Sequence, residues 1–248
     1  MVKFGWDKLK RFLAQANSWT GTQTFATIAV TTQTTPAAST SATGVVELAT
    51  DAETAAGTDT TRALTASNLA AMKAFETLWI PAASMTPTAT NGGVMGTKEF
   101  ATNDINGDYI AFDTTTEQYA EFQIPMPEGW DRSTIKAKYF WSPTDDTGDT
   151  AKTVEWGMQA GALSNDDAFD AALGTEQVIS DTILAGESGD LHVTAATPAL
   201  TVAGTPALGD LVHFKIYRHV SGTDDYGANA LLWGVWIQYK NTNTVAIW

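Results

Sequence analysis

Residues 211–220 read LVHFKIYRHV, and apolar side chains recur in them at every second position. Val212 and Phe214 therefore share one face of an extended chain, while His213 and Lys215 share the other. A period of two is typical of a strand that buries one of its faces. This stretch therefore predicts a half-buried β-strand.

The same alternation continues through residues 81–248. It is found at 121–124, 135–141, 154–159, 212–220 and 233–239. Stretches rich in turn-forming residues separate these segments. So many short strands predict a mainly β chain whose C-terminal domain is an antiparallel β-sandwich of the jelly-roll type. We also expect one short helix over residues 166–173, introduced by Ser164.

Composition sets the broad class of the protein. The chain has 248 residues, of which 44% are hydrophobic and 10% aromatic, enough for one main core with an extended or helical appendage. It has no cysteine, which excludes disulfides, a thiolate metal site and a cysteine nucleophile. The sequence shows neither a long apolar run nor a signal-peptide pattern, so we expect no membrane span.

The charge is unevenly distributed along the chain. The formal net charge is -14, yet residues 1–17 hold Lys3, Lys8, Lys10 and Arg11 against one acidic residue. The rest of the chain is therefore strongly acidic and repels phosphate backbones. We expect no nucleic acid among the partners.

Residues 1–17 predict an N-terminal amphipathic helix, because apolar residues recur at three- and four-residue intervals. A helix this short needs a partner for its apolar stripe. The candidates are copies of itself, a larger particle, a membrane surface or the chain's own body, and the first two are favoured over the others. The side chains expected to anchor and assemble the N-terminal region are Trp6, Leu9, Phe12, Leu13, Trp19 and Phe25.

Residues 18–43 contain ten threonines and no charged residue. This composition predicts an extended arm laid against neighbouring chains. Residues 44–80 then predict a short helical shaft, with a second helix capped by Thr65 or Ser67. The residues expected to form contacts between copies in the shaft are Val46, Leu48, Leu69, Met72, Phe75 and Trp79.

Two stretches resemble a known family. Residues 44–69, GVVELATDAETAAGTDTTRALTASNL, resemble the repeat of tail-fibre proteins from tailed bacteriophages, with its GxVxLAT start and TxRA end. Residues 17–25, NSWTGTQTF, resemble the opening of phage fibre proteins. The repeat is carried here by Gly44, Val46, Leu48, Ala49, Thr50, Ala56, Gly57, Asp59, Arg62 and Ala63.

The resemblance implies a homotrimer in the virion, assembled in the host cytoplasm. Its N-terminus would be fixed to other virion structural proteins, and residues 81–248 would point outward to bind a glycan or protein of the host surface. Threefold association would also give partners to the two short helices and the arm. Attachment to the tail or to the head stays open.

The chemistry-bearing residues do not assemble into a catalytic or metal pattern. His213 and His219 lie about 20 Å apart on a strand, too far to share a metal. Asp104, Asn106 and Asp108 fail the calcium-loop pattern, which requires a glutamate where Thr115 stands. We therefore expect no metal, no cofactor and no enzymatic activity. A polysaccharide-degrading fibre enzyme and a decoration protein without a receptor stay open as alternatives.

Aromatic and polar residues in expected loops are the candidates for receptor contact. A sugar ring can stack on an aromatic face while nearby side chains bind its hydroxyl groups. The residues in question are Trp130, Asp224, Asp225, Tyr226 and Asn229. Turn chemistry and trimer contact are the alternative roles for them.

Overall fold

The computed structural model describes residues 46–71, 75–144, 150–184, 190–220 and 222–242. The chain divides into two units, Met1–Glu47 and Leu48–Trp248. The predicted helix at 1–17, the predicted arm at 18–43 and Met72 lie outside the described residues.

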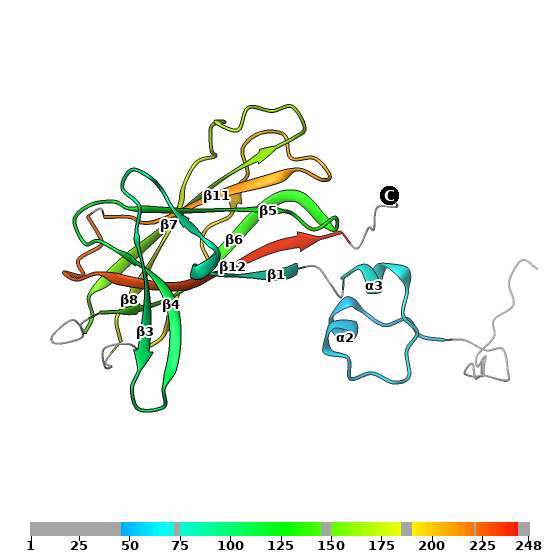
Figure 1. Ribbon diagram of the computed structural model, residues 1–248. Helices are drawn as coiled ribbons and strands as arrows, with labels where there is room; N and C mark the ends of the chain where they lie inside the picture. Colours follow the sequence, from blue (N-terminus) through cyan, green and yellow to red (C-terminus); the bar gives the residue numbers. More distant parts are fainter. Residues whose placement is uncertain (1–45, 72–74, 145–149, 185–189, 221, 243–248) are drawn as a thin grey trace, which may run out of the picture. The chain divides into compact units, whose positions relative to one another are not determined.

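Two short helices begin within the stretch that resembles the fibre repeat: α2 (Asp51–Ala56) and α3 (Ala66–Ala71) (Figure 1). Thr50 and Glu53 form a reciprocal capping box at the start of α2, and Gly57 ends the helix with a left-handed φ of 63°. Thr65 Oγ1 accepts a hydrogen bond from the Asn68 amide at 3.2 Å, so Thr65 is the residue that caps α3.

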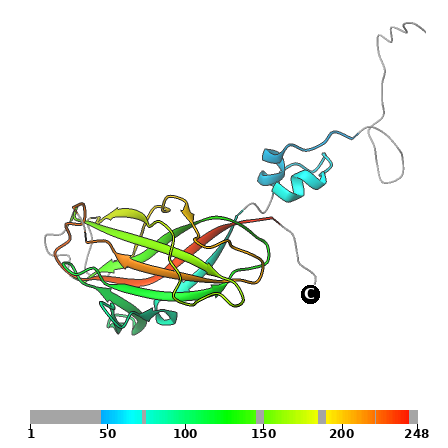
Figure 2. The same ribbon diagram turned by 90° about the horizontal axis from the view of Figure 1, so that it is seen from above.

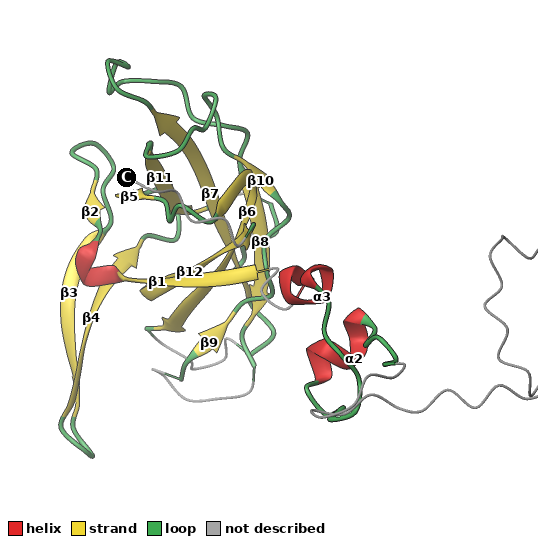
Figure 3. Cartoon of the chain, turned by 90° about the vertical axis from the view of Figure 1, so that its right-hand side faces the viewer, coloured by secondary structure: helices red, strands yellow, loops and turns green. Residues whose placement is uncertain are grey.

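The rest of the described chain forms two antiparallel sheets (Figures 1 and 2). The seven-stranded sheet contains β1 (Phe75–Pro81), β3 (Val94–Phe100), β4 (Ile105–Phe112), β6 (Trp130–Pro143), β9 (His192–Val193), β10 (Leu200–Thr201) and β12 (Ala230–Asn241). The five-stranded sheet has the order β2 (Thr86–Pro87), β5 (Tyr119–Pro125), β11 (Leu211–Arg218), β7 (Thr153–Leu163) and β8 (Gln177–Thr182). A 3-10 turn, η1 (Ala82–Ser84), follows β1. In Figure 3, β3 and β4 form a two-stranded ribbon that projects from the body of the sandwich.

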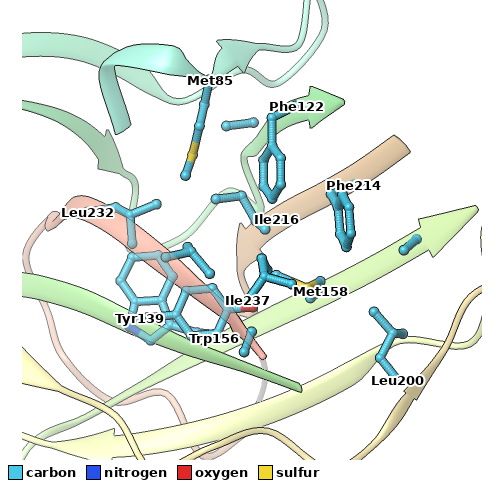
Figure 4. Packing of buried hydrophobic residues seen from close by; sticks show 14 of the residues in the cluster. Met85, Phe122, Tyr139, Trp156, Met158, Leu200, Phe214, Ile216, Leu232 and Ile237 are labelled. Atoms are coloured by element: carbon cyan, nitrogen blue, oxygen red, sulfur yellow. The ribbon is translucent and has the colours of Figure 1, made fainter. Parts of the chain in front are cut away.

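The core lies between the two sheets and is rich in aromatic rings (Figure 4). The ring of Tyr139 stacks on that of Trp156 with centroids 5.4 Å apart, and Phe112 meets Trp156 edge-on at 5.5 Å. Phe122 and Phe214 stack between β5 and β11 at 4.9 Å. These are the inward residues of the period-two pattern, so the predicted mainly β fold with a jelly-roll-like antiparallel sandwich is confirmed.

The predicted shaft helix is wrong at its C-terminal end. Phe75 and Trp79 lie on β1, which pairs with β12 along its whole length, and the sandwich begins at Phe75 rather than at residue 81. Leu78 and Ile80 pack against the core on one face of β1, while the aromatic residues lie on the other face. Because both faces carry apolar residues, a helical spacing and a strand spacing fit the sequence equally well.

The predicted helix at 166–173 is also wrong. Asp166 has a φ of 74°, which a right-handed helix does not allow. The Ser164 amide donates to the Asp167 carboxylate at 2.8 Å, closing a turn instead of a helix. The chain then continues without regular secondary structure to Gly174, whose amide donates to the Ala160 carbonyl at 2.9 Å.

Candidate functional site

A groove of about 460 Å³ lies on the outer face of the five-stranded sheet. Strands β5, β7 and β11 form its floor, and the loop between β7 and β8 forms its wall. The lining residues are Glu121, Gly161, Leu163, Phe169, Asp170, Ala171, Leu173, His213 and Lys215.

Strand register places the polar floor residues in rows across the sheet. Lys215 on β11 lies between Glu121 on β5 and Gln159 on β7. In the next row, His213 lies between Gln123 and Gly161. Their side chains all point outward because the inward positions of these strands fill the core. The floor therefore offers a cation, a carboxylate, an amide and an imidazole within two adjacent rows.

His213 is oriented from both sides. Its Nδ1 lies 3.1 Å from the Gln123 side-chain nitrogen, and its Nε2 lies 3.6 Å from a Glu121 carboxylate oxygen. An amide nitrogen only donates, so Nδ1 accepts and Nε2 carries the proton of the neutral ring. The Gln123 amide thus orients the imidazole, whose Nε2 faces Glu121.

Lys215 is held over an aromatic ring at one end of the groove. Its ammonium nitrogen lies 4.1 Å from the ring centroid of Tyr119, close enough for a cation–π contact. The Tyr119 hydroxyl donates to Glu117 at 2.7 Å. This hydrogen bond, more than burial, raises the pKa of Tyr119 to about 12. The ring therefore stays neutral under ordinary conditions and the ammonium group keeps its position.

Tyr217 lies in the next row along β11, between Tyr119 and Gly157. Its ring lies across Gly157, where an added Cβ would come within 2.4 Å of a ring carbon. Burial, followed by a hydrogen bond to Glu176, raises the pKa of the Tyr217 hydroxyl. A side chain at position 157 would displace the ring, which explains a glycine in the middle of β7.

The wall of the groove is anchored at both of its ends. Ser164 Oγ donates to the Asp210 carboxylate at 2.8 Å at the start of the loop. At its end, the Gln159 side chain donates to the Gly174 carbonyl at 3.2 Å. The segment between these two hydrogen bonds is thereby held against β7.

Phe169 is the prominent residue of the wall. Its side chain is 67% exposed, although it meets the His213 ring edge-on with centroids 6.2 Å apart. A phenyl ring that stays largely in water beside a polar floor has an apolar face free for a ligand. The groove therefore combines one exposed aromatic ring with hydrogen-bonding groups of both kinds.

This combination suits a polyhydroxylated ligand. A hydroxyl group both donates and accepts, so it can donate to the Glu121 carboxylate or accept from the Lys215 ammonium group. The C–H face of a pyranose ring is apolar and stacks on an aromatic side chain.

Three of the residues predicted to contact a receptor are buried, and that prediction is wrong for them. Trp130 and Tyr226 are core residues with exposed fractions of 3% and 1%. Asp224 pairs with Arg218 at 2.6 Å in the interior. The sequence placed all three in loops, but Trp130 begins β6 and the other two fold inward around the Arg218 guanidinium group.

Asp225 and Asn229 are exposed but lie away from the groove. Asp225 accepts a hydrogen bond from the Thr153 amide at 2.7 Å, at the opposite end of β7 from Leu163. That separation is about 30 Å along an extended strand. A receptor role for these two residues stays a prediction.

Some of the residues predicted to form contacts between copies are described by the structure and others are not. Val46, Leu48 and Leu69 are exposed apolar side chains, and their role in contacts between copies stays a prediction. The anchor residues Trp6, Leu9, Phe12, Leu13, Trp19 and Phe25 lie outside the described residues.

Sequence reasoning missed the groove although it placed much of the floor correctly. The alternation put Glu121, His213 and Lys215 on the outward face, where the structure has them. The missing element was the wall, because residues 164–176 were expected to contain a helix. The one sequence feature that could have indicated the wall is Phe169, a single aromatic residue among Asp166, Asp167 and Asp170.

Metal ligands and membrane-spanning helices can be assessed for the described residues alone. Within them, no group of three or more His, Cys, Asp or Glu side chains is arranged to hold a metal ion. In the same part of the chain, no helix has the length and apolar character needed to cross a membrane.

No protein-family model matches this chain, and no curated protein matches its sequence. Among solved structures, it is similar to the CBM22-1 and GH10 modules of Clostridium thermocellum xylanase 10B in complex with xylohexaose. The TM-score is 0.39 and the identity 13%, over 71% of this chain and 30% of that one. It is also similar to the family 11 carbohydrate-binding module from Clostridium thermocellum, with a TM-score of 0.35 and 11% identity over 65% and 94% of the two chains. For CBM28, a carbohydrate-binding module specific for non-crystalline cellulose, the TM-score is 0.33 and the identity 8%, over 64% of this chain and 86% of that one. Similarities this low assign neither a family nor a function.

Proposed function

We propose that this chain is a fibre or spike subunit of a tailed-phage virion, and that its sandwich binds a host-surface glycan in the groove of the five-stranded sheet. The observation that carries glycan binding is the pairing of the exposed Phe169 ring with the polar row of Glu121 and Lys215. A sugar needs both an apolar platform and hydrogen-bonding groups of both kinds.

The virion assignment is supported by the repeat-like segment. The residues that carry its resemblance to the fibre repeat also stabilise the local fold: Thr50 caps α2, Gly57 ends it, and Arg62 pairs with Glu53 and Asp59. Apolar side chains nonetheless stay exposed in this small segment, namely Val46, Leu48, Leu64 and Leu69. Association with further copies would cover them.

The proposed mechanism is adhesion without catalysis. Three heads on one fibre, and several fibres on one particle, would bind through many weak contacts that act together. A groove that holds a few sugar rings loosely is sufficient for this purpose, because effective concentration supplies the overall strength.

A glycan array of bacterial surface polysaccharides tests the groove. Phe169→Ala and Lys215→Met should each weaken binding about tenfold, because they remove the stacking platform and the cation. Lys98→Met is the matched control, since Lys98 also lies over an aromatic ring, that of Phe100, but on β3. Equal binding by the parent protein and all three variants would refute the groove as the glycan site. New reducing ends in the bound polysaccharide would point to a hydrolase.

A further inference from the structure

A second surface with binding chemistry lies on the outer face of the other sheet. There β1, β12 and β6 run side by side, and their register aligns outward residues in rows. One row is Trp79, Trp236 and Lys138. We call the surface formed by this row and the next one, Thr77, Gln238 and Lys136, the tryptophan–lysine face.

The two tryptophan rings are held in place yet remain in water. Phe140 meets the Trp79 ring and the Trp236 ring edge-on, each with centroids 5.0 Å apart. Trp79 also lies across Gly234, whose missing side chain makes room for it. The exposed fractions are still 45% for Trp79 and 42% for Trp236. Exposed aromatic rings with fixed orientation provide a ready stacking platform.

The charge beside these rings is opposite to that of the protein. Lys136 and Lys138 form no ion pair with any described residue, in a chain with a net charge of -14. Nearby carboxylates are engaged elsewhere. Asp131 lies 3.6 Å from Lys240, and Glu76 accepts a hydrogen bond from the buried Tyr239 on the other side of β1. The face is therefore locally cationic.

A groove of about 150 Å³ connects the Trp236 ring to the lysines. It is lined by Thr77, Lys136, Ala137, Lys138, Ala196, Trp236 and Gln238. The amide of Gln238 and the hydroxyl of Thr77 can bind neutral hydroxyl groups between the aromatic and the charged side chains.

We propose that the tryptophan–lysine face binds a carboxylate-bearing saccharide. The sugar ring stacks on Trp236, and its carboxylate pairs with Lys136 and Lys138. Charge complementarity decides between occupants. Two unpaired ammonium groups favour an anion, whereas a two-fold contact between copies of this face would bring like charges together. This site goes beyond the function proposed above, because it lies on the opposite sheet and selects charged sugars.

Titration calorimetry of the full-length protein with oligogalacturonates tests the proposal. The same oligosaccharides in methyl-esterified form are the neutral comparison, because esterification removes the charge and leaves the sugar rings unchanged. The free acid should bind about tenfold more tightly than the ester. That difference should shrink as salt is added, since the lysines are accessible to counterions.

Variants locate the binding. Lys136→Gln with Lys138→Gln should lower affinity for the free acid about tenfold and leave affinity for the ester nearly unchanged. Lys98→Gln with Lys152→Gln removes the same charge elsewhere and should have little effect. Trp236→Ala should weaken both forms, because stacking does not depend on charge.

Three results would overturn the proposal. The first is equal affinity for the free acid and the ester. The second is an equal loss of affinity for the free acid in both double lysine variants. The third is a change in sedimentation mass on Trp236→Ala without a change in saccharide binding. The last result would assign the face to contacts between copies. Phe169→Ala separates the two sites, since it should leave oligogalacturonate binding at this face intact whether or not the groove binds glycans.

Discussion

At the scale of single residues, the pair of Arg218 and Asp224 fixes the loop that joins β11 to β12. The guanidinium group is fully buried and donates to both Asp224 carboxylate oxygens, at 2.8 and 2.6 Å. It also donates to the carbonyls of Tyr226 and Ala228. A charge taken out of water requires this degree of pairing. The acidic and aromatic residues of 224–226 thus stabilise the fold and do not face a ligand, apart from the exposed Asp225.

Asp224→Asn should lower the free energy of unfolding by about 3–5 kcal/mol, because it leaves the Arg218 charge buried without a counter-charge. Asp225→Asn is the matched control and should cost about 1 kcal/mol or less, since its pair with Lys152 is exposed. Urea unfolding followed by tryptophan fluorescence measures both values. Similar losses in the two variants would contradict the structural role assigned to Asp224.

At the scale of elements, sequence periodicity predicted strands well where the two faces of a strand differ in polarity. On β11 the inward Val212 and Phe214 are apolar and the outward His213 and Lys215 are polar, so the pattern predicts a strand and no helix. On β1 the outward side chains are Phe75 and a tryptophan, so polarity does not distinguish the faces. Strand pairing with β12, more than a hundred residues later, decides that element.

The two proposed binding surfaces were less predictable than the strands for a related reason. Each one depends on register, which brings together residues that are distant in the sequence. Trp79 and Lys138 flank Trp236 only because β1 and β6 pair with β12 on opposite sides. Likewise, Phe169 reaches His213 only because its loop is anchored on β7. No local pattern records such neighbours.

The packing of β1 on β12 gives a further prediction. At Gly234 an added Cβ would lie 2.4 Å from the Trp79 ring and 2.7 Å from the Ile80 carbonyl oxygen, so β1 itself would have to move. Gly234→Ala should therefore destabilise the fold by about 1–3 kcal/mol. Gly227→Ala, with nothing within 4 Å of the added carbon, should stay within about 0.5 kcal/mol of the parent protein.

Thermal unfolding by circular dichroism compares the two glycine variants. If Gly234→Ala has the same unfolding temperature as the parent protein and Gly227→Ala has a lower one, the close approach of β1 to β12 does not stabilise the fold.

At the scale of the whole molecule, the two ends of the chain differ in how they satisfy their apolar surface. The sandwich encloses its own core, with large side chains such as Trp141, Trp156 and Tyr139 fully buried. The short helices α2 and α3 leave Leu48, Leu64 and Leu69 more than half exposed. Helices of this length gain most of their stability from packing against a partner. Self-association is therefore expected of the N-terminal part, while the sandwich carries the two proposed binding surfaces.

The full-length chain should sediment as a trimer, at three times its monomer mass of 26.4 kDa. Leu9→Glu with Leu13→Glu places two carboxylates on the predicted apolar stripe of residues 1–17 and should shift the protein towards the monomer, because buried charges disfavour association. Arg11→Glu alters the net charge by the same amount on the polar face and should leave the trimer intact. Sedimentation velocity over a range of concentrations distinguishes these outcomes. A parent protein that runs at 26.4 kDa throughout would contradict both the trimer and the avidity on which the proposed adhesion depends.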